Sequence, residues 1–446
     1  MPKVVTRFPP SPTGLIHLGN VRTLLFNYLY AKKHGGKIVF RSEDTDRQRS
    51  KREFEDTNLQ DLTWLGLSWD EFYRQSERTE IYRGYLERLI QENKAYLSKE
   101  ESKVNPGEMV EIVRLSNQNK VIQFEDVVRG AISFDTTELG DIVIARSLDD
   151  AVYHFAVVVD DFEMGITHVI RGEDHISNTP RQILIQEAIG APRPIYAHVP
   201  LILSPDRTKL SKRHGAVSLG AYRNEGFLSD ALVNYLALLG WNPGTNEEIF
   251  VMEELIDKFS LEGIQKSGAI FDRQKFLWIN KAHLSRLSED DFFAMIKAVV
   301  PERLTKMDSY SDEKLKKLLP SIRERVSIKK EFEMAAEVGE YDFAFSTPVV
   351  PLELLKWKKD NDVSVVKPRL LKVVELLENA DFGSIEGIKS TVTDYAESEG
   401  RGEVFWPLRV ALTGMEKSID PFTAAYVIGK EECINRLKKA INLINN

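Results

Sequence analysis

The chain has 446 residues, a formal net charge of −8, 42% apolar and 29% charged residues, a composition typical of a globular protein of roughly two to four domains. No stretch approaches the roughly 20 apolar residues needed to cross a bilayer, and MPKVVTRF lacks the apolar run of a signal peptide, so we expect a cytoplasmic protein without membrane contact. Cys433 is the only cysteine, which excludes an internal disulfide and a cysteine-rich zinc cluster. The acidic balance argues against a nonspecific coat on nucleic acid but not against a local basic groove.

The first predicted elements are a strand, a loop and a helix. The strand begins with the β-branched pair Val4–Val5, and helical spacing of apolar residues runs from Val21 to Leu29 until Gly35–Gly36. The loop between them delivers His17 and Gly19 to the start of the helix, where backbone amides favour phosphate and glycine allows a nucleotide to approach closely. Taken alone, such an H-x-G pattern is more often an ordinary capping turn.

Alternating strand and helix patterns continue through the first third of the chain. They resume with Ala151–Val159, His168–Arg171 and Tyr196–Leu203 after an interruption at about Tyr85–Leu148. This order predicts a parallel α/β sheet that contains an insertion. From about Ala216 onward helical patterns dominate, so the C-terminal half is predicted to be helical.

A lysine-rich loop, Lys209-Leu-Ser-Lys212-Arg213, follows the last of these strands. Alone, it would be a solvated basic turn. Together with the His17 segment it forms the second half of a predicted ATP site, because cations that meet charge developing on phosphates stabilise a transition state. The two segments therefore predict an enzyme that makes an adenylate.

The two segments resemble known signatures. TRFPPSPTGLIHLGN is similar to the HIGH region of class I aminoacyl-tRNA synthetases, although Asn20 stands at its last position, and KLSKR is similar to their KMSKS loop. Three further blocks resemble glutamyl-tRNA synthetases specifically, and the likeness covers nearly the whole length; the blocks are Arg41–Asp46, Val169–His175 and Pro407–Gly414. The insertion is shorter than in many relatives, where it often holds zinc ligands, so no zinc is expected.

The resemblance implies a Rossmann-type α/β catalytic domain with an α+β insertion, followed by an all-α anticodon-binding half. The implied domains are the catalytic domain at 1–84 and 149–215, the shortened acceptor-end insertion at 85–148, a stem-contact domain at 216–288, and two helical anticodon-binding domains at 289–355 and 356–446.

The same resemblance implies a glutamate site. Arg7 and Arg171 match arginines that face the glutamate carboxylates, Glu43 matches the residue that meets the amino group, and Ser11 and Tyr153 match neighbouring contacts. Arginine suits this task because its planar guanidinium binds a carboxylate through two hydrogen bonds and is always charged. Glutamine would leave that charge unpaired, so its rejection is expected. A structural salt bridge is the alternative for each charged residue.

The ATP site implied by the resemblance consists of His17, Gly19, His175, Lys209 and Lys212. His17 and the two lysines are the expected catalytic residues, with the lysines on the phosphates and pyrophosphate. Acid–base chemistry is not needed, because the α-carboxylate of glutamate is already ionised at neutral pH. Mg²⁺ is expected to accompany ATP, held mainly by phosphate oxygens and water. His175 is expected near the adenosine, and the alternative is an ordinary core histidine.

Arg325 and Arg409 match arginines that read the anticodon in this family, and arginine can contact base edges or stack on unpaired bases. The expected function is ligation of L-glutamate to the 3′-terminal adenosine of tRNA(Glu) through a glutamyl-adenylate, with release of AMP and pyrophosphate, by a monomer. The alternative is a nondiscriminating enzyme that also glutamylates tRNA(Gln).

Four other readings are weaker. Glutaminyl-tRNA synthetases carry a β-barrel C-terminal half, and a truncated relative that glutamylates a modified tRNA base lacks that half. A small-molecule nucleotidyltransferase would leave the C-terminal half unexplained. An inactive tRNA-binding paralogue would not need His17, Arg7 and Glu43.

Overall fold

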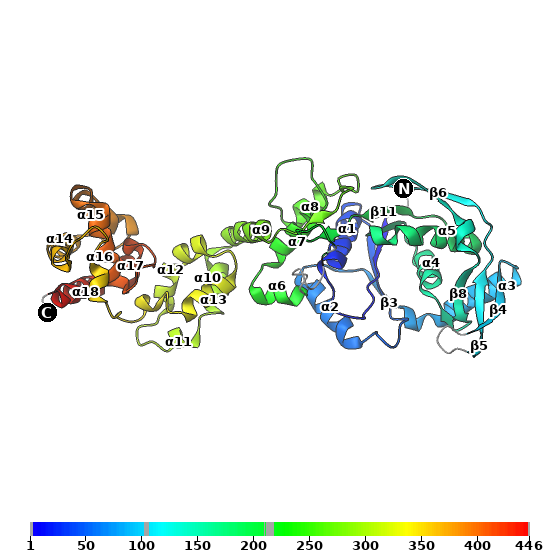
Figure 1. Cartoon of the computed structure of the whole chain (residues 1–446), viewed down its shortest axis with the longest axis horizontal. Helices are drawn as coiled ribbons and strands as arrows, with labels where there is room; N and C mark the ends of the chain where they lie inside the picture. Colours follow the sequence, from blue (N-terminus) through cyan, green and yellow to red (C-terminus); the bar gives the residue numbers. More distant parts are fainter. Residues whose placement is uncertain (1–2, 102–106, 209, 211–217, 445–446) are drawn as a thin grey trace. The chain divides into compact units, whose positions relative to one another are not determined.

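The computed structural model describes residues 3–101, 107–208, 210 and 218–444. It divides into two compact units, residues 1–280 and 281–446 (Figure 1). The strands are β1 Val5–Phe8, β2 Lys37–Ser42, β3 Glu71–Arg74, β4 Ala95–Glu101, β5 Met109–Leu115, β6 Val121–Asp126, β7 Gly130–Asp135, β8 Ile142–Ser147, β9 Asp150–Ala151, β10 His168–Gly172, β11 Ile195–Val199, β12 Ile202–Leu203 and β13 Ala269–Ile270.

The first unit and its boundary hold the helices α1 Leu18–Lys33, α2 Arg52–Trp64, α3 Thr79–Gln91, α4 Tyr153–Glu163, α5 Thr179–Ile189, α6 Leu219–Glu225, α7 Ser229–Leu238, α8 Met252–Lys258 and α9 Arg273–Arg286. The 3₁₀ helices there are η1 Gln75–Glu77, η2 Thr136–Leu139 and η3 Glu173–Asn178.

The second unit holds α10 Glu289–Lys297, α11 Glu302–Thr305, α12 Asp312–Arg325, α13 Lys329–Glu337, α14 Val366–Leu377, α15 Ile385–Glu399, α16 Arg401–Thr413, α17 Pro421–Ile428 and α18 Lys430–Leu443. Its 3₁₀ helices are η5 Asp342–Ala344, η6 Leu352–Leu355 and η7 Val363–Val365.

A parallel sheet organises the first unit. β1 pairs with β2 and β2 with β3, while β10 pairs with β11, all in parallel. Thr167, just before β10, joins the two pieces: its amide donates to Val5 O at 3.0 Å, and the Val5 amide donates to Thr167 Oγ1 at 2.9 Å. The order of strands in space is therefore β3-β2-β1-β10-β11. Along the chain, β2 and β3 are added on one side of β1, and β10 and β11 on its other side, so the strand order reverses between β1 and β10. Ligands of such sheets bind outside the carboxyl ends of the strands at this reversal.

Helix α1 follows β1 as predicted. The side chain of His17 caps its first turn, and its buried face includes Val21, Leu25 and Leu29. Beyond its C-terminus the chain returns past β1 so closely that a Cβ at Gly36 would lie 2.3 Å from Val4 O. Only glycine fits this approach, which sets β2 beside β1.

The insertion is built from antiparallel strands and is joined to the core. β4, β5, β8 and β9 form one sheet, and the β6–β7 hairpin adds to the edge of β11. Asp126 pairs with Tyr196 there, and the Val127 amide donates to Tyr196 O at 2.9 Å. The insertion is therefore not structurally separate from the catalytic sheet, because its β6–β7 hairpin extends that sheet.

Segment Ala151–Val159 lies mostly in helix α4 rather than in a strand of the sheet, whereas His168–Arg171 lies in β10 and Tyr196–Leu203 spans β11 and β12. Helix α4 buries Phe155 and every residue from there to Asp161. A short apolar run buried this fully has no helical amphipathic pattern, so periodicity does not distinguish it from a buried strand.

In the described part of the second unit, residues 281–444, every regular element is a helix, and α14, α16 and α18 pack together, as do α15 and α17. Arg436 on α18 is buried and donates to the carbonyl oxygens of Phe343 and Leu412 at 2.8 and 2.7 Å. The predicted α/β catalytic part followed by a helical C-terminal half is confirmed. None of the helices in the described ranges has the length and apolar character required to cross a bilayer.

Candidate active site

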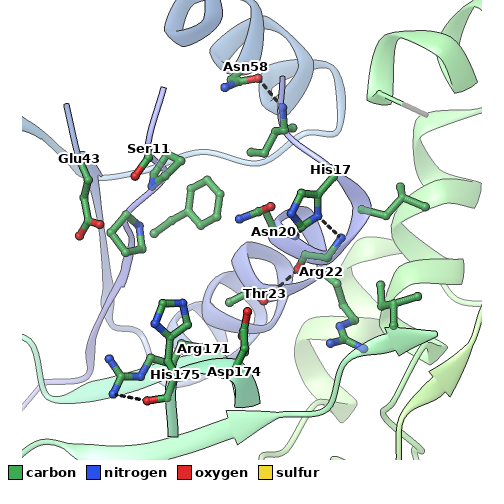
Figure 2. Close-up of a pocket in the computed structure, with 18 of the residues that line it drawn as sticks. Ser11, His17, Asn20, Arg22, Thr23, Glu43, Asn58, Arg171, Asp174 and His175 are labelled. Carbon is green, nitrogen blue, oxygen red and sulfur yellow. Dashed lines mark hydrogen bonds between the residues drawn. The ribbon is translucent and has the colours of Figure 1, made fainter. Parts of the chain in front are cut away.

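A cavity of about 440 Å³ lies at the carboxyl ends of β1, β2 and β10, where the sheet order reverses (Figure 2). All of the described residues predicted for the glutamate and ATP sites line it, namely Arg7, Ser11, His17, Gly19, Glu43, Tyr153, Arg171 and His175. Lys209 and Lys212 lie outside the described residues. Leu210, between them in sequence, lines the same cavity, and its amide donates to Ile202 O at 3.0 Å.

His17 stands at the start of α1, exposed at the cavity. Its Nδ1 accepts hydrogen bonds from the amides of Gly19 and Asn20 at 3.1 and 3.4 Å. In the neutral ring the proton is therefore on Nε2, which can donate to an anion. A Cβ at Gly19 would lie only 3.0 Å from the His17 ring, so glycine at this position lets the ring cap the helix without a close contact. The capping role that sequence alone favours and the predicted phosphate role are compatible in this geometry.

Arg7 lies at the end of β1 and is 1% exposed. Its Nε is 3.4 Å from each oxygen of Asp161, while its Nη1 is buried without a hydrogen-bond partner among the described residues. Asp161 also accepts from Arg41 Nη1 at 2.7 Å. An unpaired buried guanidinium nitrogen is costly and is rare in folded proteins, so this atom marks a place for an anionic or carbonyl ligand.

Glu43 follows β2 and faces the same cluster. Its Oε1 accepts from Arg41 Nη2 at 3.2 Å, and its side chain is 6% exposed. Burial raises the pKa of Glu43 to about 7, although the neighbouring Arg41 and Arg7 oppose that shift. A carboxyl group poised near neutrality becomes fully ionised when a ligand ammonium group arrives beside it.

Arg171 lies at the end of β10 and is held only by neutral acceptors. Its Nε donates to His198 Nε2 at 3.0 Å, its Nη1 to Gln182 Oε1 at 2.7 Å, and its Nη2 to Thr179 Oγ1 at 2.8 Å. It forms no ion pair within the described part of the chain. Burial, followed by the nearby charge of Arg7, lowers the pKa of Arg171 below its usual range. An unneutralised cation at the cavity wall attracts a carboxylate.

Two aromatic rings line the cavity beside these charges. Tyr153 is the first residue of α4, and burial raises the pKa of its hydroxyl to about 12, so it remains protonated. His175 lies on η3 with its ring centroid 6.5 Å from that of Tyr153. Burial, and then the charge of Arg171, lowers the pKa of His175 to about 4, so its ring is neutral at physiological pH. A neutral imidazole next to arginines is compatible with packing against a nucleoside.

Arg41 and Asp161 are the site residues that the sequence did not identify. Arg41 is fully buried and contacts Glu43 and Asp161. Asp160, which precedes Asp161 in the sequence, accepts a hydrogen bond from Arg78 Nε at 2.7 Å. One signal was present: two adjacent aspartates, Asp160 and Asp161, directly after the apolar run Phe155–Val159. Buried carboxylates require partners, so this pair indicates nearby cations even without a structure.

The two predicted anticodon residues lie in the helical unit, and neither lines the cavity described above. Arg325 ends α12 and forms an ion pair with Glu340, with 40% of its side chain exposed. Arg409 lies in the middle of α16, partly buried, and its Nε has no hydrogen-bond partner among the described residues. Their proposed contact with tRNA stays a prediction.

No three side chains of His, Cys, Asp or Glu in the described ranges are grouped in a way that could hold a metal ion. Cys433 lies buried in α18, where burial raises the pKa of its thiol to about 12.

Comparisons with known proteins agree with this geometry. Residues 3–109 and 97–278 match the family model described as tRNA synthetases class I (E and Q), catalytic domain, and residues 287–441 match the model described as anticodon binding domain. A protein from Aquifex aeolicus called glutamate--tRNA ligase is 38% identical over 100% of both chains, and one of the same name from Carboxydothermus hydrogenoformans is 40% identical over 98% of this chain and 100% of its own.

Solved structures give the same result. The chain resembles a glutamate tRNA ligase from Elizabethkingia meningosepticum, solved in complex with its amino acid, with a TM-score of 0.85 and 32% identity over 99% of this chain and 100% of that one. A glutamate-tRNA synthetase from Elizabethkingia anophelis superimposes with a TM-score of 0.82 at 32% identity. From its fold and these full-length similarities, the chain belongs to the glutamate--tRNA ligase family of class I aminoacyl-tRNA synthetases and is an enzyme of that class.

Proposed function

We propose that this chain activates L-glutamate with ATP and transfers it to the terminal adenosine of tRNA(Glu). The observation that carries the proposal is the charge balance beside the cavity. Four arginines, Arg7, Arg41, Arg78 and Arg171, and three carboxylates, Glu43, Asp160 and Asp161, make up the buried cluster, so it has an excess of one positive charge when all three carboxylates are ionised.

Free glutamate carries two carboxylates and one ammonium group, so its net charge complements this cluster. Arg7 offers an unpaired Nη1, Arg171 offers a charge without an ionic partner in the described ranges, and Glu43 offers a carboxylate for the ammonium group. Glutamine is neutral overall and would leave one arginine uncompensated in a buried site. That loss supports a large preference for glutamate.

ATP would occupy the part of the cavity at the start of α1. There the N-terminal end of the helix dipole favours phosphate, and His17 would donate from Nε2. Lys209 and Lys212 would neutralise the phosphates, and Gly19 and His175 would border the nucleotide. Bound Mg²⁺, held mainly by phosphate oxygens and water, would add further charge neutralisation.

The ionised α-carboxylate of glutamate would attack the α-phosphorus of ATP, and pyrophosphate would leave. A ribose hydroxyl of the terminal adenosine would then attack the activated carbonyl carbon and displace AMP. Neither step needs a strong protein base, so the residues of the cavity would act by orienting substrates and stabilising charge.

The tRNA would be recognised by the helical unit, with Arg325 and Arg409 as the proposed anticodon contacts. The comparisons give no support to the alternative that tRNA(Gln) is charged as well, since the relatives cited above are all named for glutamate. A monomer acting in the cytoplasm with ATP and Mg²⁺ completes the proposal.

Transfer of labelled glutamate to purified tRNA(Glu), with tRNA(Gln) as a parallel substrate, tests this function. Arg171→Ala should raise the KM for glutamate and reduce the exclusion of glutamine. Arg181→Ala on α5 is the matched control, because Arg181 donates to Ser177 O and does not line the cavity. Absence of glutamyl-tRNA with the folded parent enzyme, or equal effects of the two variants, would contradict the proposal.

A further inference from the structure

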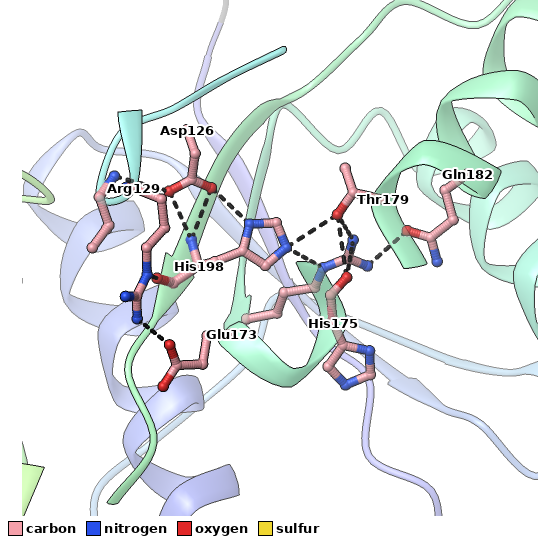
Figure 3. A network of polar contacts seen from close by, with 9 residues as sticks. Asp126, Arg129, Glu173, His175, Thr179, Gln182 and His198 are labelled. Carbon is pink, nitrogen blue, oxygen red and sulfur yellow. Dashed lines mark hydrogen bonds and ion pairs between the residues drawn. The ribbon is translucent and has the colours of Figure 1, made fainter. Parts of the chain in front are cut away.

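Behind Arg171 lies a buried histidine–aspartate pair to which the proposed reaction assigns no role. His198 on β11 and Asp126 at the end of β6 are 0% and 2% exposed. Figure 3 shows His198 between Asp126 on one side and Thr179 on the other. Asp126 Oδ2 is 2.6 Å from His198 Nδ1, and Arg171 Nε donates to His198 Nε2 at 3.0 Å. The pair therefore connects the insertion to an arginine of the cavity wall.

The hydrogen bonds define the protonation state of the ring. Arg171 can only donate, so Nε2 of His198 must accept and carry a lone pair. The ring proton is then on Nδ1, where it is donated to Asp126. Burial lowers the pKa of His198, and the hydrogen bond from Nδ1 to Asp126 only partly offsets this effect. The ring is therefore neutral when it accepts from Arg171.

Asp126 has a fixed orientation of its own. Its Oδ1 accepts from the amides of Val128 and Arg129 at 3.0 and 2.8 Å, and its Oδ2 from the amide of His198 at 3.1 Å. Burial alone would raise the pKa of Asp126, but these hydrogen bonds and that from the His198 ring hold it below its usual range. An ionised, immobile acceptor keeps the proton of His198 on Nδ1.

Every contact of Arg171 in this cluster leaves its charge unneutralised. An acidic side chain in place of His198 would form an ion pair with Arg171 and compete with the substrate carboxylate. A neutral imidazole acceptor orients the guanidinium group and does not reduce its net charge. Asp126 contacts Nδ1 of the His198 ring and Arg171 contacts Nε2, so the width of the ring separates the negative charge from the cation.

We propose that His198 and Asp126 are positioning residues that hold Arg171 in the orientation and charge state needed to bind the glutamate carboxylate. The inference rests on the proposed function. It predicts that the acceptor atom at Nε2 matters, and not merely the volume of the side chain. It also assigns to the β6 strand of the insertion a part in amino acid binding, through Asp126.

Steady-state kinetics of glutamyl-tRNA formation on four variants tests the assignment. His198→Leu removes the acceptor, whereas His198→Gln can present a side-chain carbonyl oxygen to Arg171. Asp126→Asn allows an amide to donate to Nδ1, which favours the ring tautomer with a proton on Nε2, donor against donor. Tyr196→Phe is the matched control, because it removes the buried hydrogen bond to Gln186 at 2.9 Å without altering an acceptor of Arg171.

We expect His198→Leu and Asp126→Asn to raise the KM for glutamate roughly 10- to 100-fold, as for loss of a buried hydrogen bond to a charged group. The KM for ATP and kcat should change little. His198→Gln should recover most of the lost affinity, and Tyr196→Phe should resemble the parent.

An unchanged KM for glutamate in folded Asp126→Asn or His198→Leu would overturn the assignment. So would an equal loss in His198→Gln and His198→Leu, because that result indicates a need for volume or packing alone. Melting temperatures establish whether each variant folds. If His198→Leu does not fold, the KM values of Asp126→Asn and His198→Gln test the assignment. A parent enzyme that forms no glutamyl-tRNA would instead refute the proposed function itself.

Discussion

Arg7 approaches Asp161 through Nε, which lies 3.4 Å from both carboxylate oxygens, so this ion pair leaves the Nη1 end of the guanidinium group to the cavity. The same carboxylate binds Arg41 more closely, at 2.7 Å. One buried aspartate therefore fixes two arginines, one of which has a donor reserved for a ligand. The arrangement stabilises the fold and prepares the site at once.

Asp161→Asn should destabilise the first unit strongly, because it leaves two buried guanidinium groups without their shared counter-charge. Breaking a buried ion pair from one side costs about 3 to 5 kcal/mol, which corresponds to a decrease in Tm on the order of 10 °C. Calorimetry measures the shift. Asp149→Asn is the control, because Asp149 pairs with Arg83 at the surface with 56% of its side chain exposed. Equal shifts in the two variants would contradict the role of Asp161.

Glu43 should give glutamate binding a dependence on pH near neutrality. Its pKa is raised by burial to about 7 in the structure, and only the ionised form binds an ammonium group. We expect kcat/KM for glutamate to rise as pH increases through about 7, and Glu43→Gln to lose this limb together with affinity. A pH profile of the parent that is flat between pH 6 and pH 8, roughly one unit either side of that pKa, would contradict the role.

The same pKa makes an opposite prediction for stability. A raised carboxyl pKa means that the folded chain holds more protons than the unfolded chain between the ordinary pKa of a glutamate side chain, 4.5, and about 7. The contribution of Glu43 to the free energy of unfolding is therefore greatest below pH 4.5 and is lost as pH rises through about 7. Glu43→Gln should remove this contribution to the pH dependence of the melting temperature, which a comparison with the parent across that range measures.

Lys212→Ala should lower kcat far more than it raises the KM for glutamate, because its proposed contacts form with phosphates as charge develops. A decrease of roughly 100-fold or more is expected, by analogy with loss of a preorganised oxyanion donor. Lys212→Arg keeps the charge and should retain more activity. Unchanged kcat in the alanine variant would contradict this role and favour the alternative that the KLSKR segment is only a solvated basic turn.

Arg325→Gln should relax discrimination between tRNA(Glu) and tRNA(Gln), because the two anticodons differ at a base that the matching arginine reads in this family. A good base contact contributes about 1 to 3 kcal/mol of discrimination. The ratio of kcat/KM values for the two tRNAs measures it. Glu340→Gln is informative as well, since it removes the ion pair partner but leaves the arginine. An equal loss on both tRNAs would indicate a phosphate contact.

Local signals predicted the parts of the site that depend on neighbours in sequence. The capped start of α1 at His17 follows from a loop, a glycine and a helical pattern, all within a short segment. Close approach of a nucleotide to Gly19 stays a prediction, and in the structure the group nearest to a Cβ there is the His17 ring, at 3.0 Å. The resemblance supplied Arg7, Glu43 and Arg171, which the structure brings to one cavity.

Contacts between distant segments were not predictable in the same way. The apolar run before Asp160 does not distinguish a strand from a helix buried on several sides, so α4 was not recognised. The addition of β6 to the edge of β11 depends on pairing between residues about 70 positions apart. No local sequence pattern indicates such a pairing. For the same reason the sequence did not reveal that His198 and Asp126 stand behind Arg171.

The joining of the β6–β7 hairpin to β11 limits how far the insertion could be shortened by engineering. Without that hairpin, the edge of β11 around Tyr196, which now pairs with Asp126, would lose its neighbour and be open to pairing with another molecule. A deletion that spans residues 121–135 should therefore yield a protein that self-associates through strand addition. Trimming confined to residues 102–108, between β4 and β5 in the sequence, should spare solubility, because the β6–β7 hairpin would remain on the edge of the catalytic sheet.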